Sequence, residues 1–236
     1  MTTKNILTIL LVSLYLVQLT TAQPTNIHTH ENYLKSHDLC HQRTNYATMA
    51  PSEGDSNLAA SLQLLKITLF ALQEMTLTYA TKAKTVSDQL LKDAALKENQ
   101  SDEVKEFHQK IQQFEEKFSS CNGIDELFKL VEFYSTVSSE FYEMEEQKTL
   151  TADSKIILEV LKKYKSQEMD DEFEQSFNTF VDNFAKKFDE LKEDLKQEKG
   201  ETSGKIVQWW QQVKNLKTYD EKIKAFASYV KLYETN

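Results

Sequence analysis

The chain has 236 residues, of which 40% are hydrophobic, 11% aromatic and 28% charged, and its formal net charge is −9. This composition excludes an intrinsically disordered chain, which lacks the apolar and aromatic side chains that form a core. The acidic balance and the single arginine, Arg43, argue against nucleic acid as a partner, because phosphate and base recognition depend on positive charge and on the planar guanidinium group.

Residues 1–22 have the pattern of a secretory signal peptide. Lys4 precedes an apolar run over residues 6–19, and small residues follow up to Ala22. The apolar run is shorter than the roughly 20 residues that span a bilayer, and polar residues follow it. We therefore expect cleavage after Ala22, a secreted extracellular chain and no integral membrane anchor.

Residues 23–55 form an arm that contains four of the five histidines: His28, His30, His37 and His41. Imidazole and thiolate groups are good ligands for zinc or copper, so these histidines are candidate metal ligands. Their spacing matches no zinc-finger pattern, and a disulfide-bonded cysteine cannot bind zinc as a thiolate. The favoured interpretation is an exposed arm without metal, and no cofactor is expected.

Cys40 and Cys121 are the two cysteines of the chain. An even number of cysteines in an exported chain usually pairs, because the compartment is oxidising. We predict a Cys40–Cys121 disulfide. It would close a loop of about 80 residues and contribute about 4–5 kcal/mol to stability in the chain-entropy model.

The first predicted helix is very long and lies near residues 57–97. From Leu58 onward the apolar residues advance in alternating steps of four and three, and neither glycine nor proline occurs between Gly54 and Gly123. We favour one continuous helix over a break at residues 81–87. The sequence Asn99-Gln100-Ser101 then forms a polar break and is the single N-glycosylation sequon, so we predict glycosylation at Asn99.

Further helical patterns follow to the end of the chain. They begin at an N-cap Ser101, near Asp125, near Thr151 and at Asp170, and two short helices follow a break at Gly200 and Gly204, the last opened by a capping box at Thr218. No stretch alternates polar and apolar residues for long enough to form a strand. The sequence predicts an all-α bundle of about six helices in one domain over residues 56–236.

The helix from Asp170 carries a stripe of phenylalanines that, with two tryptophans, is a candidate lining for a lipid cavity: Phe173, Phe177, Phe180, Phe184, Phe188, Trp209 and Trp210. The ordinary interpretation is a helical core, which needs an apolar stripe on each helix. Adjacent residues of a helix point in different directions, so we expect one of the two tryptophans to lie at a boundary or on the surface.

No sequence motif of a known enzyme class occurs. The phosphate-binding loop, the nucleophile elbow, the zinc-protease motif and Cys-x-x-Cys are all missing, and the acidic clusters lack the glycine of a calcium loop. We therefore expect a secreted, non-enzymatic helical protein that binds an extracellular protein partner. The alternatives are a carrier of a fatty acid or other lipid in the helical core, and metal binding by the histidine-rich arm.

Overall fold

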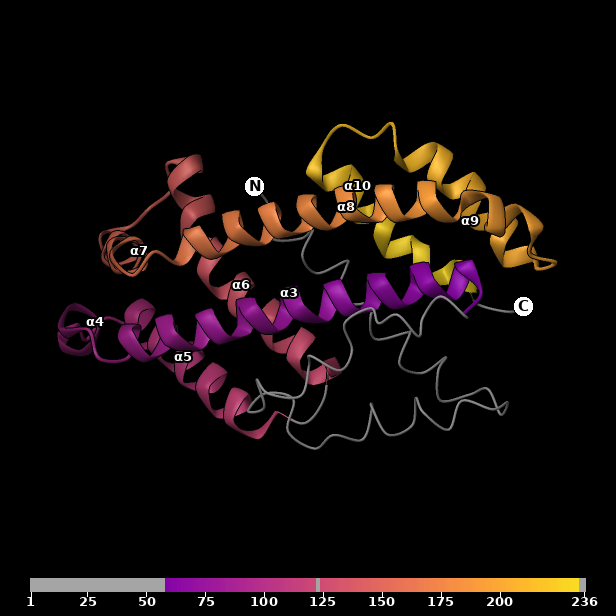
Figure 1. Ribbon diagram of the computed structural model, residues 1–236. Helices are drawn as coiled ribbons and strands as arrows, with labels where there is room; N and C mark the ends of the chain where they lie inside the picture. The colour runs from indigo at the N-terminus through magenta and orange to yellow at the C-terminus, as the bar shows by residue number, and fades with distance from the viewer. Residues whose placement is uncertain (1–57, 122–123, 234–236) are drawn as a thin grey trace. The chain divides into compact units, whose positions relative to one another are not determined.

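The structure, a computed structural model, describes residues 58–121 and 124–233, and these residues form helices without any strand (Figure 1). The prediction of an all-α fold is confirmed. None of the helices in the described ranges is long and apolar enough to cross a bilayer. The elements in chain order are α3 (Ala60–Leu90), α4 (Ala94–Glu98), α5 (Asp102–Ser120), α6 (Ile124–Gln147), α7 (Ala152–Lys163), α8 (Ser166–Gln197), α9 (Glu201–Val213), α10 (Tyr219–Tyr229) and the 3-10 helix η3 (Val230–Tyr233).

The described residues divide into two compact units. Unit 1 contains residues 76–121 and 124–173, and unit 2 contains residues 58–75 and 174–233. The helices α3 and α8 each contribute residues to both units. The prediction of one domain over residues 56–236 therefore stays a prediction.

The stretch predicted as one very long helix consists of two helices. α3 has 31 residues and ends at Leu90, and α4 begins only at Ala94. The chain breaks at this point because the side chain of Asp93 accepts a hydrogen bond from the backbone N–H of Ala95, which caps a new helix. The break lies beyond residues 81–87, the place considered from the sequence.

Several helix starts agree with the predicted capping residues. The side-chain oxygen of Ser101 accepts from the N–H of Val104 and begins α5, whose first turn has two acidic residues that favour the positive end of the helix dipole. At α10, the Thr218 hydroxyl accepts from the N–H of Glu221, and the Glu221 carboxylate accepts from the N–H of Thr218. The predicted capping box is confirmed.

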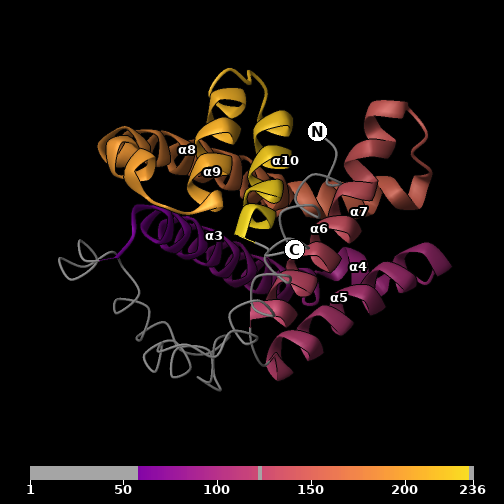
Figure 2. The ribbon, with the colours of Figure 1, turned by 90° about the vertical axis from the view of Figure 1, so that its right-hand side faces the viewer.

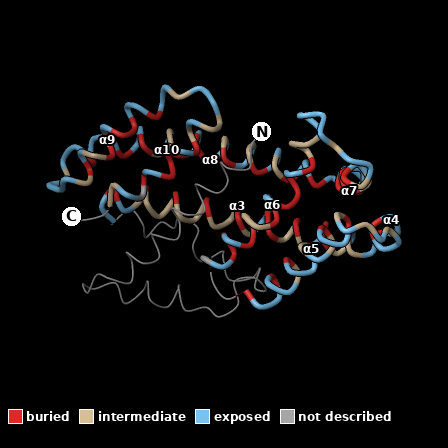
Figure 3. The backbone as a smooth tube through the Cα atoms, turned by 180° about the vertical axis from the view of Figure 1, so that it is seen from behind, coloured by how far each residue is buried: buried red, intermediate tan, exposed pale blue. Residues whose placement is uncertain are grey.

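Unit 1 has a core between α5, α6 and α7. Buried positions, red in Figure 3, recur along one side of α5 as the predicted stripe requires, at Val104, Phe107, Ile111, Phe114 and Phe118. The rings of Phe107 and Phe141 lie 5.3 Å apart, and those of Phe114 and Tyr134 lie 5.0 Å apart. Cys121 ends α5 and is buried, but Cys40 lies outside the described residues, so the disulfide stays a prediction.

Unit 2 has an aromatic core in which both tryptophans are buried, so the expectation of one exposed tryptophan was wrong. The reason is that α9 contacts two different neighbours. Trp209 packs against Phe226 and Tyr229 of α10, at ring distances of 5.1 and 4.7 Å, whereas Trp210 packs against Phe188 of α8 at 5.5 Å. Figure 2 shows α9 and α10 side by side. Two adjacent side chains of one helix can therefore both be buried when that helix has two neighbouring helices.

The expected break at two glycines occurs at only one of them. Gly200 is the N-cap of α9, but Gly204 lies inside that helix, so its role as a helix breaker was wrong. One interior glycine costs about 1 kcal/mol relative to alanine. Burial of neighbouring positions on α9, such as Ile206, offsets that cost.

The start of α3 is held within unit 2 by residues distant in sequence. The carboxylate of Glu198 accepts a hydrogen bond from the backbone N–H of Ser61 at 3.1 Å, and the Tyr233 hydroxyl donates to the Ser61 carbonyl at 2.6 Å. A carboxylate at a helix N-terminus satisfies free N–H groups and interacts favourably with the helix dipole.

Candidate functional site

A groove with a volume of about 300 Å³ lies along α4 and the first half of α5 in unit 1. This volume is at the lower end of the range of roughly 300–1,000 Å³ found for ligand pockets. Apart from one buried leucine its lining is polar, and it consists of Leu96, Lys97, Asn99, Gln100, Lys105, His108, Gln109 and Gln112. The groove therefore has the size for a small polar or charged group.

The short helix α4 is held in place by Asp93, which is buried. The Asp93 carboxylate accepts hydrogen bonds from the N–H of Ala95 at 2.9 Å, the ammonium group of Lys163 at 2.6 Å and the hydroxyl of Tyr164 at 2.9 Å. The hydrogen bond from Lys163 holds the pKa of Asp93 below its ordinary value. A helix of five residues does not form alone, so these bonds to the end of α7 fix this wall of the groove.

The link between α4 and α5 is fixed by the start of α7. The side-chain oxygen of Asn99 accepts from the N–H of Ser101 at 2.8 Å, and its amide nitrogen donates to Asp153 at 3.3 Å. The hydroxyl of Thr151 donates to the carboxylate of Glu103 at 2.8 Å. The groove walls are thus positioned by α7, although no residue of α7 lines the groove.

The groove is locally cationic in a chain of net charge −9. Two of its eight lining residues are lysines, four carry side-chain amides, and none carries a carboxylate. Lys97 and Lys105 are exposed, and neither ammonium group forms an ion pair with the described part of the chain. Free ammonium and amide N–H groups are donors, so the groove fits a ligand that presents hydrogen-bond acceptors.

His108 supplies the one buried polar atom in the groove lining that has no partner. The side chain is half-buried, and its Nε2 atom has no hydrogen bond within the described residues. Buried polar atoms in proteins nearly always have partners, and an unsatisfied one costs about 1–3 kcal/mol. A ligand that hydrogen-bonds to Nε2 would recover part of this cost. In the sequence, His108 directly follows Phe107 of the buried side of α5, and no motif there indicates a ligand.

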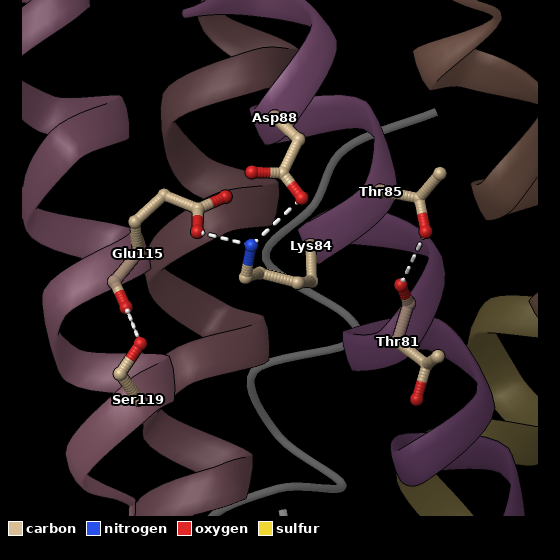
Figure 4. Close-up of polar contacts among 6 residues, drawn as sticks. All are labelled: Thr81, Lys84, Thr85, Asp88, Glu115 and Ser119. Carbon is tan, nitrogen blue, oxygen red and sulfur yellow. Dashed lines mark hydrogen bonds and ion pairs between the residues drawn. The ribbon is translucent and has the colours of Figure 1, made fainter.

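Further along α5, an ion-pair cluster joins this helix to α3 (Figure 4). The ammonium group of Lys84 lies 2.8 Å from Asp88 and 2.6 Å from Glu115. Burial alone would lower the pKa of Lys84, but its hydrogen bonds to the two carboxylates outweigh this and raise it. Burial raises the pKa of Glu115, and the hydrogen bond from Lys84 opposes that effect. This cluster holds two helices together and has no group poised for chemistry.

A second polar cluster lies at the start of α8 in unit 1. The hydroxyl of Tyr79 donates to Asp170 at 2.9 Å, and the hydroxyls of Tyr134 and Ser166 lie 3.2 Å apart. Burial raises the pKa of Asp170 to about 6, although the hydrogen bond from Tyr79 lowers it. None of these residues lines the groove. The cluster joins α3, α6 and α8, and we interpret it as structural.

Six of the seven residues predicted to hold a lipid are brought together in unit 2, but as a packed core, whereas Phe173 lies in unit 1 and packs against Tyr79. All seven are buried, and in unit 2 their rings contact one another, as in the 5.1 Å contact between Phe184 and Trp210. None of them lines the groove.

The predicted metal ligands of the histidine-rich arm, His28, His30, His37 and His41, lie outside the described residues. Within those that are described, no group of three or more His, Cys, Asp or Glu side chains could hold a metal ion.

The groove was not predicted from the sequence. Only Asn99 among its lining residues had been singled out for a function, as a glycosylation site. Lysine, glutamine and asparagine near a helix start are common on solvated surfaces, so no motif marks the groove. Comparison with known protein families, with curated proteins and with solved structures found no match.

Proposed function

We propose that the chain is a secreted, non-enzymatic binding protein whose α4–α5 groove takes an acidic segment of an extracellular protein partner. The observation that carries this proposal is the groove lining, which has no carboxylate and has two lysines and a histidine nitrogen that find no partner among residues 58–121 and 124–233. The signal-peptide pattern of residues 1–22 supports the extracellular setting.

Acidic side chains match the groove in charge and in hydrogen bonding. A carboxylate accepts from ammonium and amide N–H groups, and an exposed ion pair contributes about 0.2–1 kcal/mol. Ion pairs with Lys97 and Lys105 therefore supply part of a weak binding energy, and hydrogen bonds from the four amides and from His108 add to it and set orientation. The acidic surface elsewhere is screened beyond about 8 Å at physiological salt, so it does not prevent contact at the groove.

The carrier hypothesis has less support. A lipid carrier needs internal space, whereas the aromatic side chains of unit 2 fill the volume between its helices with one another. Phe184 alone lies within 6.5 Å of six other rings, and each of those rings is buried. Protein interiors packed in this way have few voids larger than a water molecule.

The test is fluorescence anisotropy with a labelled peptide rich in Asp and Glu, titrated with the mature chain lacking any glycan. Reversing both groove lysines, in Lys97→Glu with Lys105→Glu, should weaken binding at least about tenfold, equivalent to a loss of about 1.4 kcal/mol. The control reverses two exposed lysines outside the groove lining, Lys192 in α8 and Lys199 after the end of that helix, in Lys192→Glu with Lys199→Glu, which changes the net charge equally. The control should change affinity by less than about threefold, because neither lysine lines the groove.

Two results would contradict the proposal. Equal losses for both double variants would mean that net charge, and not the groove, attracts the peptide. Absence of binding by the native chain, or equal binding of a Lys-rich peptide, would remove the acidic partner. Competition by inorganic phosphate at millimolar concentration separates a site for any anion from a site that needs a peptide.

A further inference from the structure

The glycosylation sequon lies in the wall of the groove. Asn99 is the C-cap of α4, and Asn99 and Gln100 both line the groove. Ser101, the third residue of the sequon, is the N-cap of α5. The sequon thus occupies the two-helix junction that shapes the proposed binding site.

The folded environment of Asn99 is compatible with a glycan on its amide nitrogen. That nitrogen carries two hydrogens and donates to Asp153 at 3.3 Å. The side-chain oxygen is occupied separately, because it accepts from the N–H of Ser101 at 2.8 Å. Replacement of one amide hydrogen by a sugar leaves one N–H as a donor and leaves the side-chain oxygen as an acceptor.

We propose that Asn99 carries an N-linked glycan and that this glycan covers the groove, so that glycosylation regulates binding there. The effect on binding rests on the proposed function, whereas the modification and the covering do not. In the transfer, the Asn99 amide nitrogen forms a bond to the anomeric carbon of a lipid-diphosphate-linked oligosaccharide. The bond from that carbon to the diphosphate oxygen breaks, the lipid diphosphate leaves with the electron pair, and one amide proton is released.

The size of the groove explains the covering. A volume of about 300 Å³ corresponds to about ten water molecules, at roughly 30 Å³ for each water. An oligosaccharide of several rings is larger than this space. Attached to the wall at Asn99, it extends across the groove, and its hydroxyl groups can accept hydrogen bonds from Lys97, Lys105 and the glutamine amides. The glycosylated form therefore has no room for a peptide side chain, and the form without glycan has an open groove.

The first experiment measures modification and covering without any partner. The native chain and the Asn99→Gln variant are secreted from a eukaryotic host, and their intact masses are compared. The variant Ser101→Thr is the matched control, because threonine keeps both the sequon and the helix cap. Native and Ser101→Thr chains should carry a glycan mass that Asn99→Gln lacks. A native chain without glycan would overturn the inference and leave the proposed function untouched.

Amine acetylation then tests the covering. In the glycosylated chain, Lys97 and Lys105 should react at least about fivefold more slowly than in the native chain produced without glycan in a bacterial host, while the exposed Lys92, outside the groove lining, reacts equally in both. Equal rates at the groove lysines would overturn the covering. The acidic peptide should bind the native chain without glycan at least about tenfold more tightly than the glycosylated chain.

The combined outcomes separate the two proposals. If the peptide binds neither form but the groove lysines are protected, the proposed function fails and the glycan cover stands. If both forms bind equally, the regulation by glycan fails. The comparison uses the native chain from a bacterial host instead of enzymatic deglycosylation to aspartate, because that reaction would place a carboxylate in the groove.

Discussion

Replacing Asp170 by asparagine should stabilise the protein at neutral pH. Asp170 is largely buried, and burial raises its pKa to about 6 from an ordinary value of 3.8. A shift of about two units corresponds to about 3 kcal/mol at 1.36 kcal/mol per unit, which is the cost of keeping this carboxylate ionised in the folded state. Asparagine removes the charge, and its side-chain oxygen still accepts from Tyr79.

The direction of the pH dependence of stability follows from which state, folded or unfolded, binds the proton more tightly. Because the pKa is raised in the folded state, folded Asp170 keeps its proton between about pH 4 and pH 6, where the unfolded chain has lost it. The contribution of this residue to the free energy of unfolding therefore falls as the pH rises through that window. The asparagine variant lacks this fall, so its advantage over the native chain should be largest above pH 6 and small near pH 4.

Urea denaturation followed by far-UV circular dichroism measures the effect at pH 7 and at pH 4.5. Asp170→Asn should be more stable than the native chain by about 1–3 kcal/mol at pH 7, and the difference should shrink at pH 4.5. The exposed neighbour Asp171 supplies the control, and Asp171→Asn should change stability by less than about 0.5 kcal/mol. A loss of stability in Asp170→Asn that is larger at pH 7 than at pH 4.5 would refute the reasoning, because the charged carboxylate would then be stabilising.

Three further predictions concern an ion pair, a backbone position with positive φ and the predicted disulfide. Lys84→Met should destabilise the protein by about 2 kcal/mol in urea denaturation, because it leaves the partly buried carboxylate of Glu115 without its cation. The control Lys110→Met removes a surface ion pair and should cost about 0.5 kcal/mol or less. Equal costs for the two variants would contradict this account. Lys165 has a φ of 61°, so Lys165→Gly should raise stability by about 0.5–1 kcal/mol, and a decrease would show that its side-chain contacts matter more. The intact mass of the secreted chain should rise by two hydrogens on reduction if Cys40 and Cys121 are paired, and an unchanged mass would exclude the bridge.

The sequence by itself determined the helices and most of their ends. The Ser101 cap, the stripe of α5 and the Thr218 capping box were predicted correctly, because helix periodicity and capping depend on residues within about four positions of each other. The same locality explains the confirmed all-α fold. Locality also explains why one long helix was predicted where the structure has two. The break between them lies at Asp93, which is anchored to Lys163, a residue 70 positions away in the sequence.

Tertiary structure decided which side chains the helices bring together. The two adjacent tryptophans are both buried because Trp210 packs against α8 and Trp209 packs against both α8 and α10. The pKa of Asp170 is raised because its burial depends on helices separated by many residues, and its bond to Tyr79 spans 91 positions. The groove is cationic because Lys97 and Lys105 line it. Both lie on segments that α7 and its C-cap hold in place, namely α4 and the start of α5, and no sequence motif marks them. Packing between distant segments sets the burial of Trp209, Trp210 and Asp170 and the charge of the groove, and no local pattern in this sequence encodes these properties.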